Sequence, residues 1–305
     1  MITDSDRNAI EEYCREVGDI IFFGEPLAPR SAIEVGGRGV VWIEPRNEET
    51  LAGLIRLLTE RGVRSMVVGG GSNILFPDAD LETVLIKLNS QYFMEEDLGD
   101  TMVMARAGVS LPDLISTTCS NGLAGLEGLV GIPATVGGAV FMNASYRTEV
   151  SNMLVRVRVM DPDGEARWVG KREIDFAWHW SSLSDEKDVI TEAVFEFEEE
   201  DPRELESRLK NYFVEKMEKQ PLDGKSLGCI FRNPEGAGKT AGQLIDAAGM
   251  KGCSHGGARV SEKHANFIIN TGGAKASDVM SLMYDIRKEV KEKFSVDLES
   301  EIRIL

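Results

Sequence analysis

Two glycine-rich segments of this chain have the composition of loops that hold phosphate groups. The first, Val68-Gly69-Gly70-Gly71-Ser72-Asn73, directly follows a short strand-like run at 65–68. Glycine lets a backbone approach an anion closely and turn its N–H groups toward it. A Rossmann site would open a helix here, but residues 74–78 show no helical spacing and include a proline. The segment therefore predicts an anion-binding loop between two strands.

The second segment, Gly131 to Asn143, is apolar, nearly uncharged and rich in glycine. An ordinary loop of this length would be more polar, so the segment suits a buried ligand with a few polar edges. Two such segments fit a cofactor with two phosphates better than two unrelated turns, and a packed Gly-Ala loop is the alternative. Besides residues 68–73, we expect the cofactor to contact Gly131, Ile132, Pro133, Thr135, Gly137, Gly138 and Asn143.

A third group of residues, 228–234 and 261–267, could act on a substrate. It contains Cys229 between apolar residues and His264 in the second part. Cys229 is compatible with a proton donor, a nucleophile or a small core residue, and core packing is the commonest role of a free cysteine. Gly238-Lys239-Thr240 imitates the end of a P-loop, but the glycine required five residues earlier is Asn233. We expect a helix to start there instead.

The composition excludes several classes of function. The chain has 305 residues, enough for two or three domains, and a net charge of −17, which argues against a nucleic-acid partner. Its longest mostly apolar window, 129–142, is too short for a membrane span, and the N-terminus does not resemble a signal peptide. The four cysteines and three histidines show no metal-ligand spacing. We expect no metal, and a cytoplasmic location with free thiols.

Both helical and strand patterns occur along the chain. Helices are expected over 4–17, after Asn47 to Gly62, and over 111–120, 202–213, 240–248 and 277–294. Strands are expected within 31–44 and over 65–68, 84–88, 101–105, 155–160, 166–169, 189–197 and 266–270. The turn at 161–164 should close a hairpin.

In order along almost the whole chain, these segments resemble the UDP-N-acetylenolpyruvoylglucosamine reductases, flavoenzymes of peptidoglycan synthesis. The most specific blocks are 131–143, 228–234 and 260–270, and the terminal Glu301-Ile302-Arg303 also matches. The resemblance implies the FAD-binding fold of the p-cresol methylhydroxylase type, with subdomains at 1–88 and 89–200, followed by a C-terminal α+β substrate domain at 201–305. FAD would be bound non-covalently.

The resemblance also implies a reaction. In this family NADPH reduces the flavin, and a UDP-sugar, UDP-N-acetylglucosamine enolpyruvate, then receives the hydride at C3 and a proton at C2. Cys229 stands at the position of the proton-donating serine, and Glu301 matches the acidic residue that acts on the enolate. Lys219 and Asn233 match groups that hold the substrate diphosphate.

The chain departs from the family pattern at several positions, and one pair of them bears on the enolate. Where the family has Tyr-Arg, this chain has Trp178-His179, so His179 replaces the arginine that stabilises the enolate. Three interpretations are open: His179 acts as an imidazolium, Arg172 substitutes for the arginine, or the activity has changed. The alternatives to the reductase are an FAD-dependent oxidoreductase of the same fold with another substrate, and a paralogue that binds flavin or nucleotide-sugar without turnover.

Overall fold

The computed structural model describes residues 2–184 and 187–305, and the chain divides into two compact units whose segments are not consecutive. Unit 1 comprises Met1–Glu25, Gly39–Gly69 and Glu82–Val214. Unit 2 comprises Pro26–Arg38, Gly70–Leu81 and Glu215–Leu305. The three-part division at residues 88 and 200 stays a prediction.

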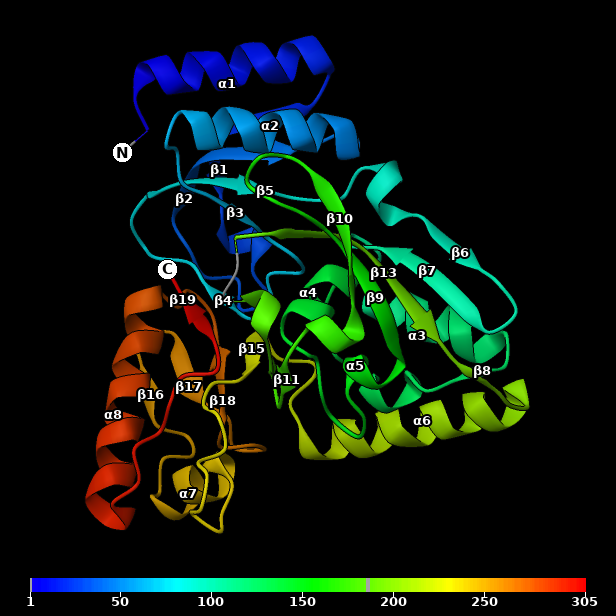
Figure 1. Cartoon of the computed structure of the whole chain (residues 1–305). Coiled ribbons are helices and arrows are strands. Elements are labelled where there is room, and N and C mark those ends of the chain that lie inside the picture. The colour runs from blue at the N-terminus through cyan, green and yellow to red at the C-terminus, as the bar shows by residue number, and fades with distance from the viewer. Residues whose placement is uncertain (1, 185–186) are drawn as a thin grey trace. The chain divides into compact units, whose positions relative to one another are not determined.

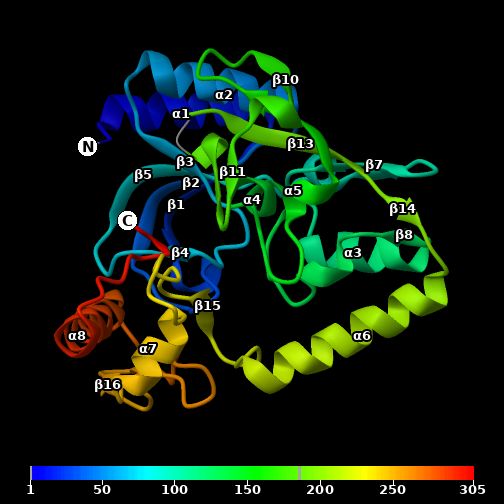
Figure 2. The ribbon, with the colours of Figure 1, turned by 60° about the horizontal axis from the view of Figure 1, so that its bottom comes forward.

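The first sheet of unit 1 carries two helices. Its strand order is β1 (Ile20–Pro26), β2 (Arg38–Glu44), β5 (Leu81–Ile86) and β3 (Ser65–Val67), with β3 and β5 parallel. Helices α1 (Asp4–Val17) and α2 (Glu48–Glu60) lie side by side in Figure 1 and in the turned view of Figure 2. Ile10 and Cys14 of α1 and Leu51 and Leu54 of α2 are fully buried in the same core. The apolar residues of both helices therefore lie on the faces that pack into this core.

The second sheet of unit 1 is antiparallel. Its order is β10 (Ala166–Gly170), β9 (Leu154–Met160), β13 (Val189–Glu196), β7 (Met102–Arg106) and β6 (Glu96–Leu98). Helix α4 (Val136–Phe141) contacts β13. The smaller elements of this unit are α3 (Leu111–Ser120), α5 (Val150–Met153), β8 (Leu123–Ala124), β14 (Glu198–Glu199), β11 (Phe176–Ala177) and β12 (Trp180–Ser181).

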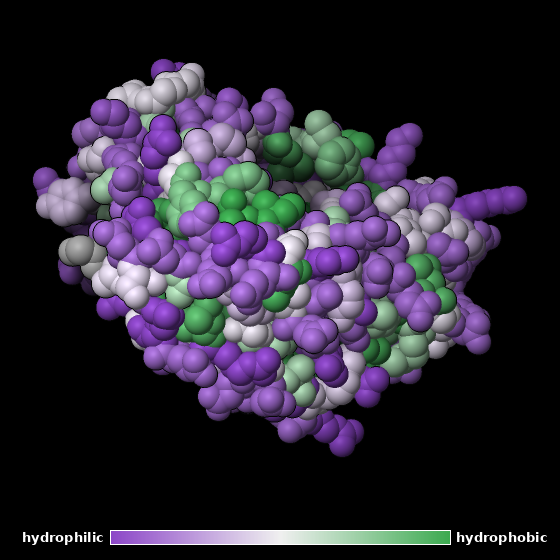
Figure 3. Space-filling model, turned by 90° about the horizontal axis from the view of Figure 1, so that it is seen from above, coloured by the Kyte–Doolittle hydropathy of each residue, from purple (hydrophilic) through white to green (hydrophobic). Residues whose placement is uncertain are grey.

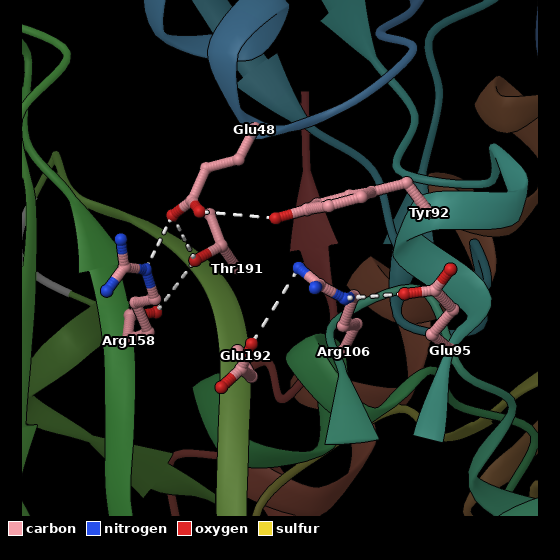
Figure 4. A network of polar contacts seen from close by, with 7 residues as sticks. All are labelled: Glu48, Tyr92, Glu95, Arg106, Arg158, Thr191 and Glu192. Carbon is pink, nitrogen blue, oxygen red and sulfur yellow. Dashed lines mark hydrogen bonds and ion pairs between the residues drawn. The ribbon is translucent and has the colours of Figure 1, made fainter. Parts of the chain in front are cut away.

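A network of polar side chains links the start of α2 to the second sheet (Figure 4). Glu48 accepts hydrogen bonds from Arg158 Nε on β9 at 2.7 Å and from the hydroxyl of Tyr92 at 3.3 Å. The guanidinium of Arg106 lies 3.6 Å from the ring centre of Tyr92 and 3.7 Å from Glu192. Because Arg158 and Glu48 are mostly buried, the network joins α2 to the second sheet of unit 1 through charge-assisted bonds.

We expect Arg158→Ala to lower the free energy of unfolding of unit 1 by about 1–3 kcal/mol, because Glu48 would be left partly buried without its main donor. Arg56→Ala is the matched control, since Arg56 pairs with Glu165 at 3.8 Å and both side chains are exposed, by 46% and 80%. An exposed pair contributes at most about 1 kcal/mol. Denaturant unfolding followed by tryptophan fluorescence measures both variants, and equal losses would contradict the structural role of the network.

Unit 2 is built on a four-stranded antiparallel sheet. The order is β15 (Ser226–Cys229), β18 (Phe267–Asn270), β17 (Ala258–Val260) and β16 (Ser254–His255). Helix α8 (Ala276–Phe294) packs on β16, β17 and α7 (Ala241–Ala247), as Figure 1 shows. The C-terminal strand β19 (Arg303–Ile304) pairs in parallel with β4 (Ile74–Leu75). Helix α6 (Pro202–Lys219) begins in unit 1 and contributes its last five residues to unit 2.

The carboxylate of Asp78 caps α8 from a distant part of the chain. It accepts hydrogen bonds from the backbone N–H groups of Ala276 at 2.7 Å and Ser277 at 3.0 Å. A carboxylate at a helix N-terminus satisfies otherwise unpaired N–H groups. The segment that contains β4 is thereby attached to the start of α8.

The structure confirms the predicted helices and the hairpin at 161–164, and it corrects one strand. Within 31–44 only Arg38–Glu44 is a strand, and residues 31–37 are not. Their backbone groups bond elsewhere: Ala32 N–H donates to Gly71 O and Gly37 N–H to Pro77 O. Glu34 also has a φ of +54°, which no strand accommodates. The sequence analysis missed β1, α4 and the short hairpin β11–β12.

Among the described residues, no helix has both the length and the apolar character of a membrane span. The face of the molecule in Figure 3 is mostly hydrophilic, with apolar side chains in separate patches.

Candidate active site

The loop 68–73 joins β3 to β4 and opens no helix, as the sequence predicted. Its left-handed residue is Gly71, with a φ of +66°. A Cβ on Gly71 would lie 2.1 Å from the carbonyl oxygen of Arg30, a backbone atom that cannot move aside. Only glycine therefore fits at this position.

Within unit 1, the two glycine-rich segments meet. A Cβ on Gly69 would lie 2.9 Å from the hydroxyl oxygen of Thr135 and 3.7 Å from Cα of Gly138. Thr135 is the N-cap of α4, where its side chain accepts the N–H of Gly138 at 3.2 Å. Lys87 donates from its ammonium group to the carbonyl of Gly69. Glycine at position 69 therefore lets the two glycine-rich segments pack against each other, and backbone of this composition is what a loop that binds a dinucleotide needs.

The side chain of Asn143 is occupied within the protein. The residue is fully buried, and its amide group donates to Glu149 and to the carbonyl of Ala177, both at 2.8 Å. Its side-chain oxygen accepts the N–H of Ser151 at 3.3 Å. The bond to Ala177 attaches the end of β11 to Asn143. The expectation that Asn143 contacts a cofactor stays a prediction.

The β11–β12 hairpin places His179 in its tight turn, with a φ of +54°. The Nε2 atom of His179 lies 3.1 Å from the carbonyl of Ser145, and the ring stacks on Trp178 with 4.9 Å between centroids. Trp178 itself is 51% exposed. A left-handed residue other than glycine is strained, and such strain is common at functional positions.

In unit 2 the fold brings Cys229 and Glu301 together. Glu301 N–H donates to the carbonyl of Ile230, the residue after Cys229, at 2.8 Å. The carbonyl of Glu301 accepts the side-chain amide of Asn73 at 3.3 Å, and Arg303 N–H donates to Asn73 O at 2.9 Å. The end of the first glycine-rich loop, the cysteine and the acidic residue therefore belong to one cluster.

The surroundings of Cys229 keep its proton on sulfur. Burial, together with the negative charge of Glu301, raises the pKa of the thiol to about 12. A hydrogen bond from Asn266 and the positive charge of Lys216 act in the opposite direction. At neutral pH Cys229 is thus a thiol, which can donate a proton but is a poor nucleophile.

His264 takes no part in this electrostatic environment. Its Nδ1 accepts the N–H of Asn266 at 3.3 Å, and its ring contacts the edge of Phe267. Burial, with the charge of Lys251, lowers the pKa of His264 and favours the neutral ring. A catalytic Cys-His pair therefore finds no support. Across residues 2–184 and 187–305, no group of three potential ligands could hold a metal ion.

Lys219 and Asn233 lie at the surface of unit 2. The Lys219 ammonium pairs with Glu215 at 2.5 Å and is 63% exposed. The side-chain oxygen of Asn233 accepts the N–H of Ala241 at 2.9 Å, at the start of α7. Glu215 and Ala241 are therefore the partners of these two side chains within the protein. The contact of Lys219 and Asn233 with a substrate stays a prediction.

Sequence reasoning missed Lys216, and it placed Asn266 in the group 261–267 without a role of its own. Lys216 is only 4% exposed, and burial lowers its pKa to about 8, against which the charge of Cys229 acts. The side chain of Asn266 accepts Phe231 N–H at 3.0 Å and donates to Phe231 O at 2.8 Å, which orients the backbone after Cys229. Lys216 lies beyond the helix expected over 202–213, and the observed helix α6 extends to include it.

Two protein families match this chain. Residues 220–305 match the UDP-N-acetylenolpyruvoylglucosamine reductase C-terminal domain, and residues 40–170 match the FAD binding domain. A UDP-N-acetylenolpyruvoylglucosamine reductase from Carboxydothermus hydrogenoformans is 39% identical over 296 residues, which is 97% of either chain. The protein of that name from Bacillus subtilis is 34% identical over 293 residues, 95% of either chain.

A solved structure agrees with these matches. The UDP-N-acetylenolpyruvylglucosamine reductase from Thermus caldophilus has a TM-score of 0.80 and 33% identity, and the alignment covers 94% of this chain and 98% of that one. The predicted fold, an FAD-binding fold of the p-cresol methylhydroxylase type followed by a C-terminal α+β domain, is confirmed.

Proposed function

The chain belongs to the UDP-N-acetylenolpyruvoylglucosamine reductase family, and we propose that it reduces UDP-N-acetylglucosamine enolpyruvate to UDP-N-acetylmuramate for peptidoglycan synthesis. FAD is the proposed cofactor, bound non-covalently, and NADPH the co-substrate. The observation that carries the proposal is the cluster of Cys229, Glu301 and Asn73 at the end of the glycine-rich loop. A cytoplasmic location is part of the proposal, and the four free cysteines are consistent with it.

Both glycine-rich segments are proposed to contact FAD. Bound FAD would supply the hydride for the reduction. Two observations support this proposal: the segments meet where a side chain on Gly69 would clash with the hydroxyl of Thr135, and position 71 tolerates no side chain. The proposed contacts are Val68, Gly69, Gly70, Gly71, Ser72, Asn73, Gly131, Ile132, Pro133, Thr135, Gly137, Gly138 and Asn143.

Cys229 is the proposed proton donor. A substrate that has received a hydride at C3 carries negative charge at C2 and needs a proton there. The Cys229 thiol, whose pKa burial raises to about 12, is fully protonated at the pH of turnover and has a proton to give. Glu301, beside it, is proposed to act on the enolate and keeps the thiol protonated through its charge.

His179 is the proposed replacement for the arginine that stabilises the enolate. One ring nitrogen faces Ser145 O, which fixes the orientation of the imidazole at the turn of the hairpin. Lys219 and Asn233 are proposed to bind the substrate diphosphate. If His179 has this role, His179→Arg keeps turnover and His179→Ala loses it; equal turnover in both would favour Arg172.

The proposal is tested with the purified full-length protein. We expect it to be yellow, to release its flavin on acid precipitation, and to oxidise NADPH rapidly only when UDP-N-acetylglucosamine enolpyruvate is present. Flavin that NADPH reduces but the enolpyruvyl sugar does not reoxidise would indicate a related oxidoreductase with another substrate. Flavin that NADPH does not reduce would indicate a binding paralogue without turnover.

A further inference from the structure

The segment 141–145, at and just after the end of helix α4, bonds to both strands of the β11–β12 hairpin within unit 1. Asn143 donates from its side-chain amide to the carbonyl of Ala177, at the end of β11, at 2.8 Å. On the other strand, the hydroxyl of Ser181 donates to the carbonyl of Phe141 at 2.8 Å. Ser181 is fully buried. The two bonds therefore attach the hairpin to this segment on either side of its turn.

The turn between these two bonds carries His179, and a third bond reaches its ring. The Nε2 atom lies 3.1 Å from the carbonyl of Ser145, the last residue of the same segment. A carbonyl oxygen can only accept a hydrogen bond, so Nε2 carries the hydrogen. The bond thus sets both the orientation of the imidazole and its neutral tautomer. The placement of the imidazole depends on the segment 141–145 at three points.

Asn143 is itself held in one conformation by the bonds of its side chain. It is fully buried, and its φ of +43° lies in the left-handed region, which few residues other than glycine adopt. Both hydrogens of its amide are used, one by Glu149 and one by Ala177, each at 2.8 Å. Its side-chain oxygen accepts the N–H of Ser151 at 3.3 Å. A strained residue persists where its surroundings hold it in place, and such positions are common at functional sites.

We propose that the segment 141–145, chiefly through the side chain of Asn143, positions the imidazole of His179 for the reaction. This inference rests on the proposed role of His179 in stabilising the enolate. Asn143 attaches the hairpin two residues before His179 and so keeps the ring beside the carbonyl of Ser145. Asn143 is a positioning residue in this proposal, because it acts through the imidazole.

Asn143 is also the last residue of the second glycine-rich segment, 131–143. The segment proposed to contact FAD and the hairpin that carries His179 are therefore joined through one side chain. Because both amide hydrogens serve the protein, a contact between Asn143 and the cofactor has to use other atoms of the residue. The two roles predict different losses when the amide is removed: flavin for a cofactor contact, and substrate reduction for a positioning residue.

The first test observes the imidazole by NMR without relying on catalysis. The chain has three histidines, so isotope labelling of their ring nitrogens in the FAD-loaded protein gives few signals, and His179→Ala identifies the signal of His179. In the wild type, the bond to Ser145 should protect the Nε2 hydrogen from exchange with water. Asn143→Gly, which removes the amide and suits a positive φ, should speed this exchange by at least about tenfold. An unchanged exchange rate overturns the proposal.

Two further variants control this measurement. Asn152→Ala removes the amide of an exposed asparagine that bonds to the hydroxyl of Thr148 at 3.1 Å, so it should leave the exchange at His179 unchanged. Ser181→Ala removes the second bond to the hairpin through loss of one hydroxyl oxygen, and it should speed the exchange as well. If Asn143→Gly does not fold, Ser181→Ala decides, and a wild-type exchange rate in it overturns the proposal.

The second test measures reoxidation of the reduced flavin by the enolpyruvyl sugar. Asn143→Gly should slow this step by about 10²-fold, the cost of misplacing a group by about 1 Å, while flavin content and reduction by NADPH stay at the wild-type level. In a His179→Ala background, Asn143→Gly should slow reoxidation no further, because it acts through the imidazole. Effects of the two substitutions that multiply overturn the proposal. So does a loss of flavin from Asn143→Gly with unchanged exchange at His179.

The two tests separate this inference from the proposed function. If His179→Ala reoxidises like the wild type, the proposed role of His179 is wrong, and this inference falls with it. If His179→Ala is slow and Asn143→Gly keeps the wild-type rates of exchange and reoxidation, only the role of Asn143 is wrong. The ring signals of His255 and His264, which lie in unit 2, should be the same in all variants and thereby check the fold.

Discussion

In the Cys229→Ala variant, NADPH should reduce the bound flavin at the wild-type rate, whereas reoxidation by the enolpyruvyl sugar should slow by about 10²–10⁴-fold, the usual contribution of one general acid. The asymmetry follows from the chemistry, because only the second half-reaction consumes a proton at carbon. It also follows from the site, where burial and Glu301 keep Cys229 in the thiol form. Rapid mixing of pre-reduced protein with substrate measures this step directly.

Cys229→Ser is the matched control, since a hydroxyl of similar size can donate a proton from the same place. It should retain reoxidation, while the alanine variant does not. Asn266 and the backbone pairing with Phe267 remain in both variants, so their fold should be equal. Reoxidation of Cys229→Ala at the wild-type rate would make Cys229 a packing residue.

Gly71→Val should abolish flavin retention. A valine there must adopt a φ of +66° and place its Cβ 2.1 Å from Arg30 O, so the backbone of the loop has to move. Because Ala32 N–H bonds to Gly71 O, that movement alters the whole loop up to Asn73. We expect FAD affinity to fall at least about tenfold, which costs about 1.4 kcal/mol. Flavin absorbance after gel filtration, and titration with FAD, measure the loss.

Gly62→Val separates backbone strain from loss of the binding loop. Gly62 has a similar φ of +63°, but nothing lies within 4 Å of the position of its Cβ. The Gly62→Val variant should therefore lose only about 1–2 kcal/mol of stability, which is the cost of a valine in the left-handed region. It should keep its flavin. If Gly71→Val retains FAD like Gly62→Val, the loop 68–73 does not hold the cofactor.

Sequence reasoning identified the elements whose causes are local. Asn47, Ser110 and Thr240 cap the helices that were expected to follow them, each through a bond to the residue three positions on. The loop after β3 was expected to open no helix because residues 74–78 lack the spacing and include a proline, and β4 follows it. Such features depend on residues within one turn of each other, so the order of residue types suffices.

Family resemblance supplied the candidate site residues, but the structure decided which of them share an environment. Cys229 and Glu301 are brought together in unit 2, and Asn73 bonds to Glu301 across 228 positions. No pattern in the sequence predicts that the amide of Asn143 is used within the protein or that Arg158 bonds to Glu48, 110 positions away. The prediction of a strand at residues 31–37 was wrong. Backbone N–H groups of this segment bond to Gly71 and Pro77, which lie in another part of the chain, and the residue types of the segment itself do not indicate these partners.

What this sequence determined by itself is therefore the family, the helices and strands with local signals, and the two glycine-rich segments. The pKa values of Cys229 and Lys216, and hence their protonation states, depend on the tertiary structure. Cys229 and Lys216 are an ordinary thiol and an ordinary amine in the sequence, and burial moves their pKa values toward 12 and 8. The physical reason is that burial and neighbouring charge are properties of the assembled fold, in which groups distant in sequence exclude water from one another.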